Sequence, residues 1–229
     1  FYTADNMVFF SMSKTDFKYI KKITEKYLSS IPPQKHRINR NEPYKIKPQQ
    51  IQSKKKTHLS HIITGGKAYD MYSKKRYPLF LLNNILGGPG MNSRLNVSLR
   101  EKHGLVYNVE SNITTYTDTG IFSIYLGTDR KNKERAIDLV EKEMTGLRTK
   151  ELTEIQLTAA KKQAIGQLGV ASDNRESVFL GLGKSFLHHN NYEMLPDVFR
   201  KIENITSEQI LEVANDIFHP EKLFRLIYE

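Results

Sequence analysis

Two neighbouring stretches decide the fold of this chain: Leu86-Gly-Gly-Pro-Gly-Met-Asn-Ser-Arg-Leu95 and Leu99-Arg-Glu-Lys-His-Gly-Leu-Val-Tyr107. The Gly-Gly-Pro-Gly run ends the apolar helix before it, because glycine and proline both disfavour a helix interior. Asn92 or Ser93 can then cap a second short helix, which Gly104 ends. The sequence therefore predicts a helix, a break, a short helix, a tight turn and the start of a strand.

Apolar periodicity predicts further elements on both sides of this stretch. We expect strands at 7–12, at 57–64 up to Gly65-Gly66, at 106–116 with 121–127 as a hairpin, and at 223–228. We expect a helix at 13–28, opened by Ser13 with Asp16, a helix that has Pro78 in its first turns and ends near Leu86, and a helix at 133–147. Two more helices open at the capping boxes of Thr153 and Thr206. The helical spacing of Phe17, Ile20, Ile23 and Tyr27, and of Ala136, Ile137, Val140, Met144 and Leu147, predicts one buried face on each helix.

The region from 31 to 56 differs in composition from its surroundings. It is rich in proline, glutamine, asparagine and basic residues and has little apolar periodicity, as an exposed connection does. We therefore expect a linker at 31–56, a first piece at 1–30 and a larger domain at 57–229. Because the sequence opens with Phe1, we also expect it to be a portion of a longer chain.

Charge and composition narrow the function classes. The 229 residues carry 35 Lys and Arg against 25 Asp and Glu, a net charge of +10. The basic runs 54–56 and 74–76 are not interleaved with aromatic residues, so we interpret them as solvated faces and expect no nucleic-acid partner. We expect no membrane partner either, because the apolar runs are shorter than a spanning helix needs. With zero cysteines, a zinc ion could be held only by His, Asp or Glu.

The two stretches that decide the fold are similar to the second half of pitrilysin/insulinase-type zinc metallopeptidases, which include the mitochondrial processing peptidases. The shared features are the glycine-rich break, the Ser-Arg-Leu helix start, and Leu-Arg-Glu followed by glycine and tyrosine. The segment Tyr2-Thr-Ala-Asp-Asn-Met-Val8 resembles the close of the family's first half. The resemblance implies an α+β fold, a two-layer domain with helices on one face of a sheet, preceded by a closing strand and helix of the other repeat.

The family's chemistry implies roles for two residues. In this family an arginine and a tyrosine seven residues apart contact the substrate and the transition state, and the matching positions are Arg100 and Tyr107. A guanidinium and a phenol are suitable donors where negative charge develops. The alternative is that Arg100 is a surface helix residue and Tyr107 a strand residue at the sheet rim.

The resemblance also implies a zinc cofactor, held by a His-x-x-Glu-His motif in the family's first half. That motif does not occur in this sequence, so we expect zinc only in an intact enzyme and no metal site here. His58 and His61, three apart on an expected strand, point to opposite faces, and His188 and His189 diverge on a helix. We interpret 181–185, which superficially resembles a phosphate-binding loop, as helix.

These observations lead to one preferred function and an alternative. The preferred function is the substrate-binding, transition-state-stabilising half of a zinc endopeptidase that cleaves unfolded peptides, inactive alone. Its partners would be a zinc-binding half or subunit and a peptide. The alternative is a non-catalytic partner subunit. We further expect a cytoplasmic protein, and a homodimer in which an open edge at 7–12 pairs with a second copy.

Overall fold

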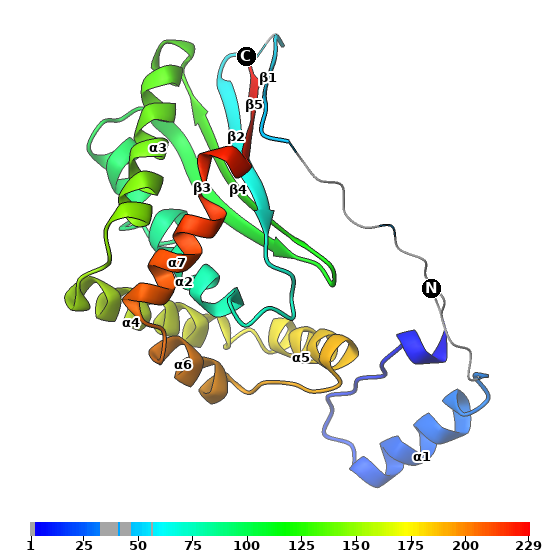
Figure 1. Cartoon of the computed structure of the whole chain (residues 1–229). Helices are drawn as coiled ribbons and strands as arrows, with labels where there is room; N and C mark the ends of the chain where they lie inside the picture. Colours follow the sequence, from blue (N-terminus) through cyan, green and yellow to red (C-terminus); the bar gives the residue numbers. More distant parts are fainter. Residues whose placement is uncertain (1–2, 33–40, 42–46, 56) are drawn as a thin grey trace. The chain divides into compact units, whose positions relative to one another are not determined.

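The structure is a computed structural model that describes residues 3–32, 41, 47–55 and 57–229. The chain divides into two compact units (Figure 1). Unit 1 comprises Phe1–Asn41 and Leu168–Val198, and unit 2 comprises Glu42–Gln167 and Phe199–Glu229. Much of the expected linker at 31–56, namely 33–40, 42–46 and 56, lies outside the described residues. The expected domain boundaries stay a prediction.

Unit 2 is built on a five-stranded sheet in the order β1-β5-β2-β4-β3. The strands are β1 (Gln50–Ser53), β2 (Ser60–Ala68), β3 (Val106–Thr115), β4 (Gly120–Thr128) and β5 (Leu223–Tyr228). β1 runs parallel to β5, whereas the β5–β2, β2–β4 and β4–β3 pairs are antiparallel. The predicted β3–β4 hairpin and the predicted last strand are confirmed.

Helices cover one face of this sheet (Figure 1). The helices that lie wholly in unit 2 are α2 (Arg76–Gly87), α3 (Lys133–Thr149) and α7 (Ser207–Ile217). Helix α4 (Glu154–Ala171) begins in unit 2, and helix α6 (Leu195–Glu203) ends in it. The five residues predicted for the inner face of α3 are all buried. The predicted capping boxes of Thr153 and Thr206 both form. The two-layer α+β fold is thereby confirmed.

Two strand predictions in unit 2 need correction. β2 begins at Ser60 and continues through Gly65 and Gly66 instead of ending there. A side chain at position 65 would bring its Cβ to 2.3 Å from the carbonyl oxygen of Phe122, so the glycine permits a close approach of β2 to β4. Gln50–Ser53, expected within the linker, forms an edge strand because its backbone pairs with β5.

Unit 1 contains η1 (Ala4–Asn6), α1 (Phe17–Leu28) and α5 (Arg175–His189). The strand predicted at 7–12 is wrong. Met7 has extended backbone angles, but a strand needs a hydrogen-bonded neighbour, and no described residue pairs with this segment. Instead, the Phe10 ring packs edge-on against Phe179, with centroids 5.3 Å apart. The homodimer was expected because a strand at 7–12 would have an open edge. Without that strand, the reason for expecting the homodimer no longer holds.

Helix α1 ends at Leu28 as predicted, but two details differ. Its N-cap is Asp16, whose carboxylate accepts from the backbone N–H groups of Lys18 and Tyr19, and Ser13 instead accepts from Thr15. The predicted apolar face exists in the sequence, yet no residue of α1 is buried. Helical spacing determines which face of a helix can be buried. Burial of that face also requires a surface for it to pack against. Among the described residues, no helix is long and apolar enough to cross a membrane.

Candidate functional site

Arg100 lies near the end of η2 (Asn96–Glu101), a short helix with a π-type turn in which the Lys102 N–H donates to the Val97 carbonyl over 3.0 Å. The helix packs against β3 and α3, and Leu95 and Leu99 on its inner side are fully buried. These contacts hold the helix in place. The Arg100 side chain points away from this core: it is exposed and has no hydrogen bond or ion pair with another described residue.

A glycine turn joins this helix to the strand that carries the tyrosine. Gly104 has φ +58°, the left-handed conformation that glycine adopts at no steric cost. Its N–H donates to the Arg100 carbonyl at 3.0 Å, and the Leu105 N–H donates to the Leu99 carbonyl at 2.9 Å. The Thr128 hydroxyl also donates to the Leu105 carbonyl. Backbone hydrogen bonds therefore fix the end of η2 to the start of β3.

Tyr107 occupies an irregular position of β3. Val106 lies opposite Thr128 and Asn108 lies opposite Gly127, so Tyr107 is the extra residue of a β-bulge. A bulge redirects the side chain that it carries, and bulges are frequent beside active sites. The Tyr107 ring is 64% exposed, whereas Val106 is buried. The structure thus confirms the predicted placement of Arg100 at a helix end and Tyr107 at a strand start, and it presents both to solvent.

Sequence reasoning missed a third residue at this site. The Tyr107 hydroxyl donates to Oδ1 of Asp129 over 3.4 Å, which is a long and weak hydrogen bond. Asp129 directly follows β4, and the antiparallel register places the end of β4 beside the start of β3. The predicted hairpin could have identified Asp129, because the start of the first strand and the end of the second strand of a hairpin lie side by side.

The arrangement offers hydrogen-bond donors from Arg100 and Tyr107 beside the carboxylate of Asp129. A guanidinium without a protein partner and a weakly held phenol can both turn to an acceptor on a bound molecule. No hydrogen bond joins Arg100 to Tyr107 among the described residues. The roles predicted for the two residues stay predictions, and the geometry leaves both donors available.

The other candidate groups have ordinary surroundings. Nδ1 of His61 lies 2.9 Å from the Tyr125 hydroxyl and the two rings stack, whereas His58 lies in the bend before β2. Residues 181–185 are part of α5, as interpreted from the sequence. In the described ranges, no three His, Asp or Glu side chains are grouped so that they could hold a metal ion.

A family model described as "Peptidase M16 inactive domain" matches residues 1–164. The chain is 26% identical over 227 residues to an uncharacterized zinc protease, YmxG, of Bacillus subtilis. That match covers 99% of this chain and 55% of the Bacillus protein. The chain is also 26% identical over 167 residues to the mitochondrial-processing peptidase subunit alpha of Rattus norvegicus, covering 68% of this chain and 32% of the subunit.

A solved structure, a peptidase M16 inactive domain from Pseudomonas fluorescens, superposes with a TM-score of 0.83 at 22% identity. The superposition covers 93% of this chain and 51% of the Pseudomonas chain. The fold described above is therefore the fold of that domain. The chain spans about half the length of the Bacillus relative and less of the rat subunit.

Proposed function

Because the chain belongs to the peptidase M16 family, in which it matches the inactive domain, we propose that it is the substrate-binding half of a zinc-dependent endopeptidase. In this proposal it contacts an unfolded peptide and stabilises the transition state of its hydrolysis. A second half, supplied by the same chain or by a partner subunit, holds the metal. The names of the relatives, zinc protease and processing peptidase subunit, support a peptidase context.

The observation that carries the proposal is the pair of available donors around the Gly104 turn. The Arg100 side chain has no partner among the described residues, and the Tyr107 hydroxyl is held only over 3.4 Å. A buried helix face and a bulge position the two side chains without using their polar ends. A peptide carbonyl that gains negative charge during hydrolysis can accept hydrogen bonds from both side chains.

In this proposal the other half holds the zinc ion, and no three His, Asp or Glu side chains are grouped as metal ligands in the part of the chain that the structure describes. The contribution of this chain is therefore to bind the peptide, orient its carbonyl group and donate hydrogen bonds to the developing oxyanion. Each of these tasks requires the polar ends of Arg100 and Tyr107 and no proton transfer from either residue.

The test is to mix this chain with a separately produced first half that carries the His-x-x-Glu-His motif and to measure cleavage of an unstructured reporter peptide with zinc present. We expect cleavage by the mixture and none by this chain alone. Arg100→Ala and Tyr107→Phe should each lower the cleavage rate by about 10²-fold, the effect of losing one oxyanion donor.

Two matched variants control for unspecific effects. Lys102→Ala removes an exposed cation that is two residues from Arg100, and Tyr116→Phe removes a hydroxyl from an exposed tyrosine that follows β3. Both should retain the activity of the mixture. If the two halves associate and fold but the mixture does not cleave, or if the controls lose as much activity as the site variants, the proposed role is wrong.

A non-catalytic partner subunit is the second candidate. The similarity to a peptidase subunit, the mitochondrial-processing peptidase subunit alpha, favours it. Under this alternative the chain binds the zinc-bearing half and stabilises it. Arg100→Ala would then leave the cleavage rate unchanged while this chain still raised the melting temperature of the other half.

A further inference from the structure

A cavity of about 260 Å³ lies between the second half of α3 and the start of β5, in unit 2 and on the opposite edge of the sheet from Tyr107. Its walls come from β1 together with Gln49 before it, from β2, from α3, and from the segment between the end of α7 and β5. The lining residues are Gln49, Gln50, Thr64, Glu141, Met144, Thr145, Arg148, Phe218, Pro220, Leu223, Phe224 and Arg225.

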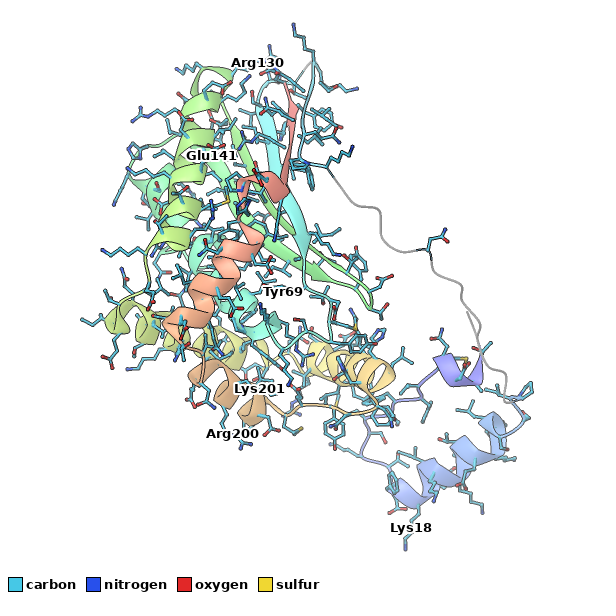
Figure 2. The ribbon with its side chains drawn as sticks, viewed as in Figure 1. Lys18, Tyr69, Arg130, Glu141, Arg200 and Lys201 are labelled. Carbon is cyan, nitrogen blue, oxygen red and sulfur yellow. The ribbon has the colours of Figure 1, made fainter. Side chains whose placement is uncertain are left out.

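One side of the cavity carries a fixed cation. The Arg225 Nε donates to the Thr64 hydroxyl over 3.1 Å, and its Nη2 lies 2.6 Å from the Glu141 carboxylate. Figure 2 shows Glu141 on α3, from which it reaches this arginine. The side chain of Arg225 is only 18% exposed. The ion pair neutralises Glu141, so this carboxylate does not oppose an anion in the cavity.

The second cation of the cavity comes from α3. Arg148 lies in the last turn of α3, and its side chain has no hydrogen bond or ion pair with a described residue. Its Nε–H is buried and donates no hydrogen bond to a described residue. A buried donor that makes no hydrogen bond is unfavourable, so such groups normally meet a bound molecule or water. With Arg225 and Glu141 paired, Arg148 leaves the cavity with a net charge of +1.

The remaining walls are largely apolar. Met144 and Phe218 are buried, and Leu223 and Phe224 are half-buried. A bare inorganic anion would meet the guanidinium but leave these side chains without a contact. A carboxylate attached to an apolar group satisfies both, because a planar carboxylate matches the forked donors of arginine.

We propose that this cavity binds a carboxylate that carries an apolar group, and that the ligand is the free carboxyl terminus of a peptide with an apolar last residue. The carboxylate lies on Arg148, and the last side chain lies against Met144 and Phe218. The carboxylate site follows from the cavity alone, whereas the peptide as its source rests on the proposed peptidase function.

Binding is tested on this chain alone by calorimetry, which needs neither zinc nor the other half. The probes are N-acetyl-leucine, its amide, a tetrapeptide ending in leucine, the same peptide amidated, and inorganic phosphate. We expect both acids to bind about tenfold or more tightly than their amides, because only the acids offer a charged acceptor. Equal binding of acid and amide, or phosphate binding as tight as that of the acid, overturns the proposal.

Variants locate the binding site. Arg148→Gln, or Arg148→Met if that protein does not fold, should weaken binding of the acid by about tenfold or more. Lys142→Gln, which removes an exposed cation from α3 outside the cavity, should leave binding within about twofold. Unchanged binding in folded Arg148 variants contradicts the site.

The affinities of the two acids, N-acetyl-leucine and the tetrapeptide, identify the source of the carboxylate. Tighter binding of the tetrapeptide than of N-acetyl-leucine supports a peptide terminus, and equal affinity supports a free small acid and refutes the peptide source. Because no cleavage is measured, failure of this proposal leaves the role of Arg100 and Tyr107 untouched. Conversely, an inert peptidase mixture does not change the binding result.

Discussion

Helices α3 and α1 carry the same sequence signal and reach different outcomes. Both have apolar residues at helical spacing, and both form where the spacing predicts. The inner face of α3, from Ala136 to Leu147, is buried in a helix that packs against α7 and η2, whereas Phe17 and Tyr27 of α1 are 76% and 64% exposed. The comparison teaches that periodicity predicts a helix and the side available for packing, while burial depends on a partner surface.

The largest effect that sharpens this comparison comes from truncating one apolar residue on each helix. Leu147 is 1% exposed, so Leu147→Ala should lower the free energy of unfolding by about 3 kcal/mol through lost burial and a cavity. Ile23 is 38% exposed, so Ile23→Ala should cost less than about 0.5 kcal/mol. Urea denaturation measures both, and equal losses would break the comparison.

Removing the N-cap side chains of α7 and α1 should have a smaller effect on stability than truncating Leu147. Thr206 caps α7 in a complete capping box, and Thr206→Ala should cost about 1 kcal/mol of global stability because α7 is part of the packed layer. Asp16 caps α1, but Asp16→Ala should reduce only the helicity of α1. Amide hydrogen exchange separates the two outcomes: global loss of protection for Thr206→Ala and loss confined to 17–28 for Asp16→Ala.

The smallest expected effect is the contribution of the charged Asp216 carboxylate to the free energy of unfolding. Asp216 accepts from Tyr69 over 2.7 Å and pairs with Lys222 (Figure 2 labels Tyr69). Partial burial raises the pKa of Asp216, but the hydrogen bonds from Lys222 and Tyr69 outweigh this, and the net pKa lies below the ordinary value. Burial of the Tyr69 phenol, together with its hydrogen bond to the Asp216 carboxylate, raises the pKa of Tyr69.

Because the folded-state pKa is lowered, Asp216 stabilises the fold above its unfolded pKa, and this contribution is lost as the pH falls through the folded pKa. Asp216→Asn should cost no more than about 1 kcal/mol near neutral pH, since the carboxylate is partly exposed, and the difference should shrink between about pH 6 and about pH 3. Glu25→Gln breaks an exposed ion pair within α1 and should change unfolding little at either pH. A pH-independent difference for Asp216→Asn would contradict the assignment.

Local chemistry made most of the fold predictable. The glycine at 104, the capping boxes of Thr153 and Thr206 and the β3–β4 hairpin each depend on neighbouring residues, and all form as expected. The failures depend on distant partners. The segment at 7–12 has strand composition but no ladder among the described residues, and Gln50–Ser53 has linker composition but pairs with β5.

The candidate site follows the same rule. Arg100 and Tyr107 were found from a motif, and the turn between them from one glycine. The proximity of Asp129 follows from the predicted hairpin, whereas the bulge at Tyr107 arises from strand register, which composition does not specify. Arg148 and Arg225 lie far apart in the sequence, and they line one cavity that α3 and β5 share, where the Glu141–Arg225 ion pair joins the two elements.

The most direct test of the central claim is a double-mutant cycle in the zinc-containing mixture of the two halves. We predict that Arg100→Ala and Tyr107→Phe each lower kcat/KM by about 10²-fold and that the double variant loses less than the product of the two, because both donors act on one developing charge. Single variants that retain the wild-type kcat/KM within about twofold would contradict the claim that these residues contact the reacting peptide.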